Sequence, residues 1–198
     1  MCSPSNVICC RPMRRDQFNP SFNFLNSMNI LYLDYNGVLH DSQVMRNRKR
    51  GLYLAKPDKV FFEWLPILTS LLAPATNLKI VLSTSWIRAV DFNTAKYELS
   101  PDLRDRVIGS TFHHPGLLQS AFDTMSRGQQ ILDDVRRRQP TSWFAIDDDA
   151  FGWPEAYRDR LIQTDGAIGV SDPTVQLAIK AMLASLPEPH RAASTSSE

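Results

Sequence analysis

The sequence predicts an α/β domain in which a central parallel sheet lies between two layers of helices. Short apolar runs alternate along the chain with segments of helical periodicity, and this order is typical of a parallel sheet covered on both faces. The apolar runs are continuous and lack the apolar–polar alternation of a half-exposed strand. A length of 198 residues with 43% hydrophobic residues suits one domain with its own core.

The first predicted strand is the apolar run NILYLD, residues 29–34, which ends on an aspartate. Residues 56–74 carry apolar side chains at helical spacing and predict the first helix. Pro57 suits its first turn, and Pro66 predicts a kink or a break within it. A second strand is predicted over residues 78–86, LKIVLSTSW, which ends in hydroxyl side chains.

The second half of the chain continues the alternation. Residues 106–112 (RVIGSTF) predict a third strand, and residues 142–149 (SWFAIDDD) predict a fourth that ends in three acids. Helical spacing predicts a helix over residues 126–138 between them and a closing helix over residues 172–186. We therefore expect a Rossmann-like three-layer sandwich with a central parallel sheet.

Composition sets the expected limits of the folded unit. Residues 1–27 mix Pro, Ser, Asn and Cys without apolar periodicity, and residues 186–198 have the composition of a tail. We expect a flexible leader over 1–27, a folded core over 28–185 and a disordered tail over 186–198.

Charge and cysteine content exclude several classes of protein. The 22 basic and 21 acidic side chains nearly cancel, so net charge favours neither general nucleic-acid binding nor attachment to a membrane surface. Cys2, Cys9 and Cys10 are an odd set at one end of the chain, which excludes a disulfide framework. The chain contains neither a secretory signal nor a run of about 20 apolar residues. We predict a cytoplasmic protein with no membrane partner and no disulfide partner.

Polar side chains follow three of the predicted strands at the point where each strand ends: Asp34 and Asn36, Ser83 and Thr84, and Asp147, Asp148 and Asp149. The carboxyl ends of parallel strands meet at one edge of a sheet, where ligands bind. Carboxylates that converge there repel each other unless a cation neutralises them. Magnesium prefers oxygen ligands and is commonly shared with a phosphate. The pattern therefore predicts Mg²⁺ and phosphate chemistry.

Four motifs in this order resemble those of the haloacid dehalogenase-like superfamily of phosphohydrolases: LDYNGVL, IVLSTSW, SRGQQI and WFAIDD. The likeness is closest to the small branch without a cap domain that is described as the domain of RNA-repair-like, Swiss Army Knife, proteins. It spans about residues 29–180. The resemblance implies a core without a cap domain, since residues 87–126 hold only helical and strand material of the core.

The resemblance implies a role for each matching position. Asp34 would attack phosphorus and form an aspartyl-phosphate, which water then hydrolyses. Mg²⁺ would be bound by Asp34, by Asp147 and by the backbone carbonyl of Asn36. Asp148 would hold a water bound to the metal.

The phosphoryl group would be held by Ser83, with Thr84 nearby, and by Arg127, which stands where the family usually has a lysine. Arginine keeps the positive charge and adds a bidentate contact with phosphate oxygens. The simpler interpretations are that Ser83 and Thr84 cap the following helix and that Arg127 is an ordinary basic residue near a helix start.

Asn36 departs from the family pattern, because phosphatases of this family have a second aspartate there. That aspartate protonates the leaving oxygen and later activates water, and such acid–base catalysis contributes about 10²–10⁴-fold. Asparagine does neither. We expect slow turnover, or turnover restricted to leaving groups that need no proton.

Three alternatives stay open. The chain is a catalytically impaired module that binds magnesium and phosphate, or a phosphotransferase or dehalogenase variant, or Asn36 was introduced to trap a substrate. Dehalogenation is disfavoured because it needs no metal, and the acidic pair Asp147 and Asp148 indicates one.

A basic run, RNRKRG at residues 46–51, lies where this fold places a flap over the active site. Its cations are candidate substrate contacts together with Arg88: Arg46, Arg48, Lys49 and Arg50. The alternative is a solvated flap. A site without a cap is open to bulky substrates, so we expect a phosphorylated nucleic-acid end, a nucleotide or another bulky phosphoester.

Overall fold

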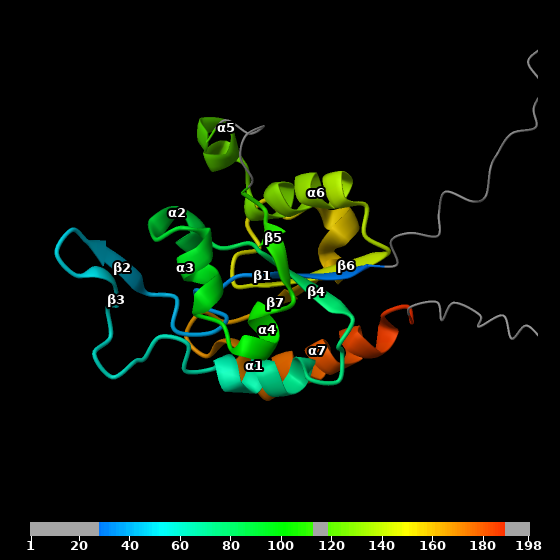
Figure 1. Cartoon of the computed structure of the whole chain (residues 1–198), viewed down its shortest axis with the longest axis horizontal. Helices are drawn as coiled ribbons and strands as arrows, with labels where there is room; N and C mark the ends of the chain where they lie inside the picture. The colour runs from blue at the N-terminus through cyan, green and yellow to red at the C-terminus, as the bar shows by residue number, and fades with distance from the viewer. Residues whose placement is uncertain (1–27, 113–118, 189–198) are drawn as a thin grey trace, which may run out of the picture.

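A computed structural model describes residues 28–112 and 119–188 of the chain. Its centre is a sheet of five parallel strands in the order β5-β4-β1-β6-β7 (Figure 1). The strands are β1 (Asn29–Leu33), β4 (Leu78–Leu82), β5 (Val107–Ser110), β6 (Ser142–Asp147) and β7 (Leu161–Gln163). The predicted fold class is confirmed. The predicted leader, 1–27, and residues 189–198 of the predicted tail lie outside the described residues.

Two layers of helices cover the sheet, above and below it in Figure 1. Side chains of β1 alternate between them, because successive residues of a strand point to opposite faces. Leu31 and Leu33 pack in the core cluster shared with α1 (Leu65–Leu72) and α7 (Pro173–Ser185). Ile30 and Tyr32 pack in the other cluster, with α6 (Arg127–Arg138). Every residue of β1 is buried, which explains its continuous apolar sequence.

The remaining elements are short. A hairpin of β2 (Val44–Asn47) and β3 (Gly51–Leu54) projects at the left of Figure 1. The others are α2 (Trp86–Ala89), α3 (Phe92–Tyr97), α4 (Pro101–Arg104), α5 (Gln119–Thr124) and the 3₁₀ helices η2 (Glu155–Arg160) and η3 (Gly169–Ser171). Within the described ranges, the segments between the sheet strands contain α1, α6, this hairpin and these short helices, with no separate cap domain.

The helix predicted over 56–74 is wrong in its first half. Only residues 65–72 form α1, and Pro66 lies in its first turn rather than at a kink. Phe62 has a φ of +59°, a left-handed conformation that a helix cannot include. The preceding apolar residues instead pack beside the site described below. The fifth strand, β7, was not predicted, because three residues are too few to show a period.

Over the residues that the structure describes, no helix has both the length and the apolar character that crossing a membrane requires.

Candidate active site

Three strand ends are held side by side by hydrogen bonds that extend beyond the strands themselves. The amide of Asp34 donates to the carbonyl of Ile146 at 3.1 Å, which joins the ends of β1 and β6. The amide of Ser83 donates to the carbonyl of Leu33 at 2.9 Å, which joins β4 to β1. The residues that follow these strands are thus brought to the middle of one sheet edge. The strand order also reverses about β1, the position at which α/β sheets bind ligands.

A cluster of three carboxylates occupies this edge. Asp34, Asp147 and Asp148 each offer an oxygen, and these oxygens all lie within 4.8 Å of one another. Asp34 and Asp147 are buried and Asp148 is half-buried. Asp149, the third acid of the run, is exposed. The predicted convergence of these residues is therefore observed.

Arg127 reaches the cluster from the start of α6. Ser126 caps this helix: its hydroxyl accepts a hydrogen bond from the amide of Gln129, whose side chain accepts one from the amide of Ser126. This capping box makes Arg127 the first helical residue. Its Nε lies 3.1 Å from Oδ2 of Asp147, and its Nη2 lies 3.6 Å from Oδ2 of Asp34.

Burial and mutual repulsion raise the pKa values of the three carboxyl groups. Burial raises the pKa of Asp34, partly offset by the guanidinium of Arg127. Burial, followed by repulsion from Asp34, raises the pKa of Asp147 well above its usual range. Burial and the same neighbour raise the pKa of Asp148 to about 6. Each carboxyl group thus holds its proton more tightly than an ordinary aspartate does, and a bound cation would oppose this shift.

The cluster has the properties of a site for a hard divalent cation. The buried oxygen Oδ1 of Asp34 has no hydrogen-bond partner among the described residues, and Oδ2 of Asp147 has only its ion pair with Arg127 there. Buried polar atoms without hydrogen-bond partners are rare. Three ionised carboxylates and the single charge of Arg127 sum to −2, which one divalent cation would balance. Carboxylate oxygens are preferred ligands of Mg²⁺. The residues present therefore fit magnesium.

Two hydroxyl side chains lie at the end of β4. Ser83 is fully buried, and its Oγ has no hydrogen-bond partner among the described residues. Thr84 is also buried, and its Oγ1 accepts a hydrogen bond from the amide of Trp86 at 3.4 Å. The N-cap of α2 is Ser85, whose side chain makes no capping hydrogen bond, so neither Ser83 nor Thr84 caps this helix as the simpler interpretation expects. The buried hydroxyl of Ser83 is left with an unused hydrogen-bonding capacity toward the site.

The side chain of Asn36 is held by two neighbours. Its Oδ1 accepts a hydrogen bond from the indole Nε1 of Trp86 at 2.8 Å, and Nε2 of His40 lies 3.1 Å from the same oxygen. Neither Trp86 nor His40 is among the site residues predicted from the sequence. The turn that brings His40 back beside Asn36 is closed by a hydrogen bond from the amide of Gly37 to the carbonyl of His40 at 2.8 Å.

Gly37 lets this turn approach the acidic cluster. Its φ is +67°, and a Cβ at this position would lie 2.2 Å from Oδ2 of Asp148. Its carbonyl also accepts a hydrogen bond from the buried hydroxyl of Thr164 at 2.7 Å. The first motif is therefore packed directly against the carboxylate that ends the fourth.

The basic flap is the β2–β3 hairpin. Arg46, Arg48, Lys49 and Arg50 are all exposed, and none forms an ion pair with a described residue. A cavity of about 500 Å³ separates the hairpin from the end of α2. Arg88 differs from these cations, because its guanidinium forms an ion pair with Asp123 of α5.

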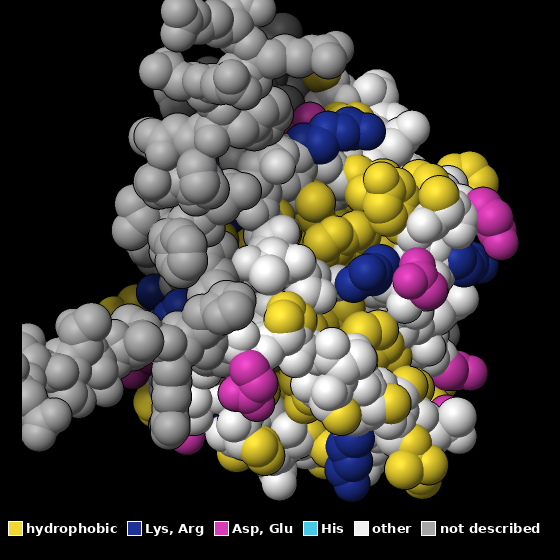
Figure 2. Space-filling view, turned by 90° about the vertical axis from the view of Figure 1, so that its right-hand side faces the viewer, with side chains coloured by type: hydrophobic (Ala, Val, Ile, Leu, Met, Phe, Trp, Pro, Cys, Tyr) yellow, Lys and Arg dark blue, Asp and Glu magenta, His cyan; other side chains and the backbone are white. Residues whose placement is uncertain are grey.

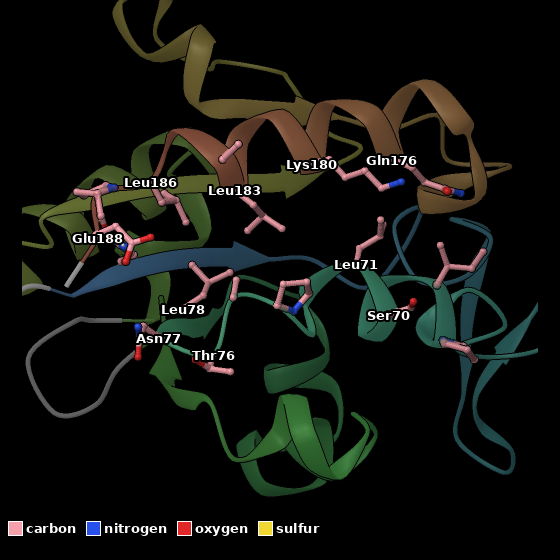
Figure 3. Close-up of a pocket in the computed structure, with 17 residues that line it drawn as sticks. Ser70, Leu71, Thr76, Asn77, Leu78, Gln176, Lys180, Leu183, Leu186 and Glu188 are labelled. Atoms are coloured by element: carbon pink, nitrogen blue, oxygen red, sulfur yellow. Dashed lines mark hydrogen bonds between the residues drawn. The ribbon is translucent and has the colours of Figure 1, made fainter.

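A larger cavity, of about 990 Å³, lies between α1 and α7. The side chains of Leu71, Leu78 and Leu183 point into it (Figure 3). It opens near Asn29, at the beginning of β1, whereas Asp34 follows the end of that strand. The face at the right of Figure 1, where β1 begins, shows apolar side chains among scattered single charges (Figure 2). This cavity contains none of the candidate site residues, so size alone does not identify the site.

Comparison with known proteins adds one match. A family model described as the HAD domain in Swiss Army Knife RNA repair proteins matches residues 30–175. No curated protein and no solved structure gives a significant match. The matched range runs from β1 into α7 and includes the acidic cluster, Ser83, Asn36, Arg127 and the basic flap.

Proposed function

The chain belongs to the family of HAD domains found in Swiss Army Knife RNA repair proteins, a family of phosphohydrolase type, and from this membership we propose that it is a magnesium-dependent phosphohydrolase with Asp34 as nucleophile. The observation that carries the proposal is the convergence of carboxylate oxygens of Asp34, Asp147 and Asp148 within 4.8 Å at the ends of two central strands, β1 and β6. Cytoplasmic location was predicted from the sequence and stays a prediction.

Asp34 would be the nucleophile. Its carboxylate follows the central strand and lies 3.6 Å from Nη2 of Arg127. Ser83, whose amide donates to the carbonyl of Leu33, has a hydroxyl without a hydrogen-bond partner among the described residues. Attack on phosphorus forms an aspartyl-phosphate and expels the leaving group, and water then cleaves the acyl phosphate. Arg127 and Ser83 would orient the phosphoryl oxygens and balance their charge.

Magnesium would be held by Asp34, Asp147 and the backbone carbonyl of Asn36, with Asp148 orienting a water. When bound, the ion would neutralise the carboxylates and polarise the phosphoryl oxygens. Arg127 already supplies one positive charge between Asp34 and Asp147. The arginine thereby reduces repulsion between nucleophile and substrate without replacing the divalent ion.

The substrate class that we propose is a phosphorylated nucleic-acid end or a nucleotide. Two features support it: the site has no cap within the described ranges, and the hairpin beside it carries four exposed cations without ion-pair partners. Cations in this state are free to neutralise a phosphate backbone. Arg88 contributes less, because Asp123 already neutralises its charge.

Hydrolysis of an aryl phosphate tests the enzymatic proposal. We expect turnover with magnesium that is lost on chelation and reduced at least about 10³-fold in Asp34→Asn. Asp149→Asn is the matched control, since Asp149 is an exposed acid two residues from the metal ligand Asp147. Turnover that survives Asp34→Asn would exclude the aspartyl-phosphate route.

Binding of a 5′-phosphorylated single-stranded oligonucleotide tests the substrate class. The logarithm of the binding constant falls linearly with the logarithm of the salt concentration. In Arg48→Ala/Arg50→Ala the slope of this line should become shallower by about 0.7 for each phosphate that the flap no longer neutralises. Arg136→Ala/Lys180→Ala removes the same charge from exposed positions on α6 and α7 and should leave the slope unchanged. Equal effects of the two pairs would contradict a role for the flap.

A second candidate function is favoured by one observation, the amide at position 36. The side chain of Asn36 cannot act as a general acid or a general base. The second candidate is therefore a module that binds magnesium and phosphate without turnover. Absence of hydrolysis in both the natural chain and Asn36→Asp, with magnesium binding retained, would select this function.

A further inference from the structure

The orientation of the Asn36 amide is defined by the atom that faces it. The indole N–H of a tryptophan is only a donor, and it lies 2.8 Å from the side chain of Asn36. The atom that it meets must be the amide oxygen. Nε2 of His40, 3.1 Å from the same oxygen, must then also carry a hydrogen, because that oxygen only accepts. The amide nitrogen of Asn36 is consequently on the opposite side.

The two donors are themselves immobilised. The ring of His40 is fully buried and packs edge-on against Phe61 at 5.1 Å and Phe62 at 4.9 Å. Phe61 and Phe62 also pack edge-on against the ring of Trp86, at 5.2 Å and 5.1 Å. Burial lowers the pKa of His40 to about 4, so the ring is neutral at physiological pH. If the Asn36 amide turned over, its NH₂ group would face the N–H groups of Trp86 and His40, with no acceptor among them. The packed rings therefore hold the amide in one orientation.

The amide nitrogen of Asn36 is left as an open donor. It has no hydrogen-bond partner among the described residues, and it is not among the buried atoms that lack one. Asn36 lies two residues after Asp34, in the turn that Gly37 packs against Asp148. Asn36 therefore has a hydrogen-bond donor of fixed orientation two residues after the proposed nucleophile, at the position where phosphatases of the family have the aspartate that protonates the leaving oxygen.

We propose that the substrate of this site is a phosphoanhydride, the terminal phosphoryl group of a 5′-di- or triphosphorylated nucleotide or nucleic-acid end, with Asn36 donating a hydrogen bond to the departing oxygen. This inference rests on the proposed phosphohydrolase function. An alcohol leaves a phosphomonoester as a strongly basic alkoxide and needs a proton. A phosphate leaves an anhydride as a weakly basic anion, with a pKa of about 6 for its last ionisation, and a hydrogen bond is sufficient to stabilise it.

Neither step of the reaction requires a proton from position 36. The Asp34 carboxylate attacks the terminal phosphorus, and the bond from phosphorus to the bridging oxygen breaks. Its electron pair departs on the shortened phosphate chain, which takes no proton. Water then attacks the aspartyl-phosphate at phosphorus, the electron pair of the broken bond returns to the carboxylate, and one water proton passes to a phosphoryl oxygen. The product is dihydrogen phosphate.

The charge of the flap agrees with this substrate class. Each additional phosphate of an anhydride adds negative charge beyond that of a monoester. The four flap cations are exposed, and none forms an ion pair with a described residue, so they are available to this charge. Arg127, in contrast, is already placed beside Asp34 and Asp147 for the group that is transferred.

The test compares a nucleoside 5′-triphosphate with the corresponding 5′-monophosphate, both with magnesium. Wild type should release phosphate from the triphosphate at least about 10²-fold faster than from the monophosphate. This factor is the smallest contribution that is typical of a general acid, which only the monophosphate reaction needs. Asn36→Asp should narrow this ratio by tenfold or more by raising the monophosphate rate. Asn36→Ala, which has neither donor nor acid, should slow the triphosphate reaction about tenfold without raising the monophosphate rate.

Trp86→Phe tests the orientation itself. An aromatic ring remains but one of the two donors to Oδ1 of Asn36 is removed, so the amide is held only by His40. We expect this looser orientation to give a steeper dependence of rate on leaving-group basicity across a series of aryl phosphates. A merely structural role for Trp86 would lower all rates equally and leave that slope unchanged. Circular dichroism confirms that each variant is folded.

The outcomes separate the inference from the function on which it rests. No turnover of any substrate by wild type or Asn36→Asp overturns the phosphohydrolase proposal. Turnover of the monophosphate within tenfold of the triphosphate by wild type overturns the anhydride inference and leaves the phosphohydrolase proposal standing. A leaving-group slope that is identical in wild type, Asn36→Asp and Trp86→Phe also overturns the inference.

Discussion

The Nε of Arg127 lies 3.1 Å from Oδ2 of Asp147, so a fixed positive charge shares the carboxylate that the metal would use. This relationship makes the arginine both a neutralising partner and a competitor of the metal. The two carboxylates raise the pKa of Arg127 despite its burial, so the competition does not vanish at alkaline pH. Changes to this cluster, or to the turn beside it, should therefore alter the binding of metal, proton and phosphate in distinguishable ways.

Replacing Arg127 should separate metal binding from phosphate binding. In Arg127→Met, magnesium should bind at least about tenfold more tightly at pH 8, because a nearby positive charge is removed from a site of reduced dielectric. Inorganic phosphate should bind at least about tenfold more weakly. Arg127→Lys keeps the charge and serves as the control. Calorimetric titration measures both affinities, and weaker magnesium binding by Arg127→Met would contradict the competition.

Asp147→Asn should stabilise the metal-free protein and abolish its response to magnesium. The substitution removes a buried charge beside Asp34, while the amide oxygen still accepts from the amide of Asp149, as Oδ1 of Asp147 does at 3.0 Å. In wild type, magnesium at about 100 times its Kd should add about 2.7 kcal/mol. Thermal unfolding with and without magnesium measures the difference. Asp149→Asn should keep the full magnesium response, and a retained response in Asp147→Asn would remove Asp147 from the metal site.

Magnesium affinity should fall as the pH is lowered through about 6. The pKa of Asp148 is raised to about 6 in the metal-free protein, and magnesium requires the ionised form. Protons and the metal therefore compete below that pH, and the apparent affinity should decrease by up to about tenfold per pH unit for each group that must ionise. Asp148→Asn should bind more weakly at pH 8 and show a shallower decline. An affinity that is constant between pH 8 and pH 5 would contradict this account.

Gly37→Ala should be more damaging than Gly51→Ala, although both glycines have a φ near +70°. At Gly51 nothing lies within 4 Å of the added Cβ, so the cost should be only the strain of a left-handed residue, about 1–2 kcal/mol. At Gly37 the Cβ would meet the carboxylate of Asp148, which should add about 1–3 kcal/mol of overpacking and weaken magnesium binding. Chemical denaturation and metal titration measure the two effects. Equal destabilisation of both variants would show that Asp148 moves aside freely.

The central strands and the convergence of the acids could be predicted from the sequence, for a physical reason. A strand buried on both faces has few polar positions, so β1 and β4 are visible as apolar runs that are interrupted only by Asn29 and the half-buried Lys79. Because the carboxyl ends of parallel strands share one edge, Asp34 and Asp147 had to meet there once the strands were recognised.

What could not be predicted depends on contacts between distant residues. Phe61 and Phe62 have helical spacing in the sequence, but they enclose His40 and Trp86 instead of forming a helix. The orientation of Asn36 depends on Trp86, 50 positions away in the chain. Local periodicity contains no information about either contact.

The sheet order has a consequence for how the protein is made. β1 lies in the middle, and its neighbours begin at Leu78 and Ser142. The second neighbour therefore starts 142 − 29 = 113 residues after the start of β1, roughly 6–23 s later at about 5–20 residues per second. During this time the central strand, whose residues are all buried in the finished fold, has a free hydrogen-bonding edge on the nascent chain, and such edges promote aggregation. Chaperone capacity and translation speed, rather than the stability of the finished fold, are therefore expected to limit the yield of native protein.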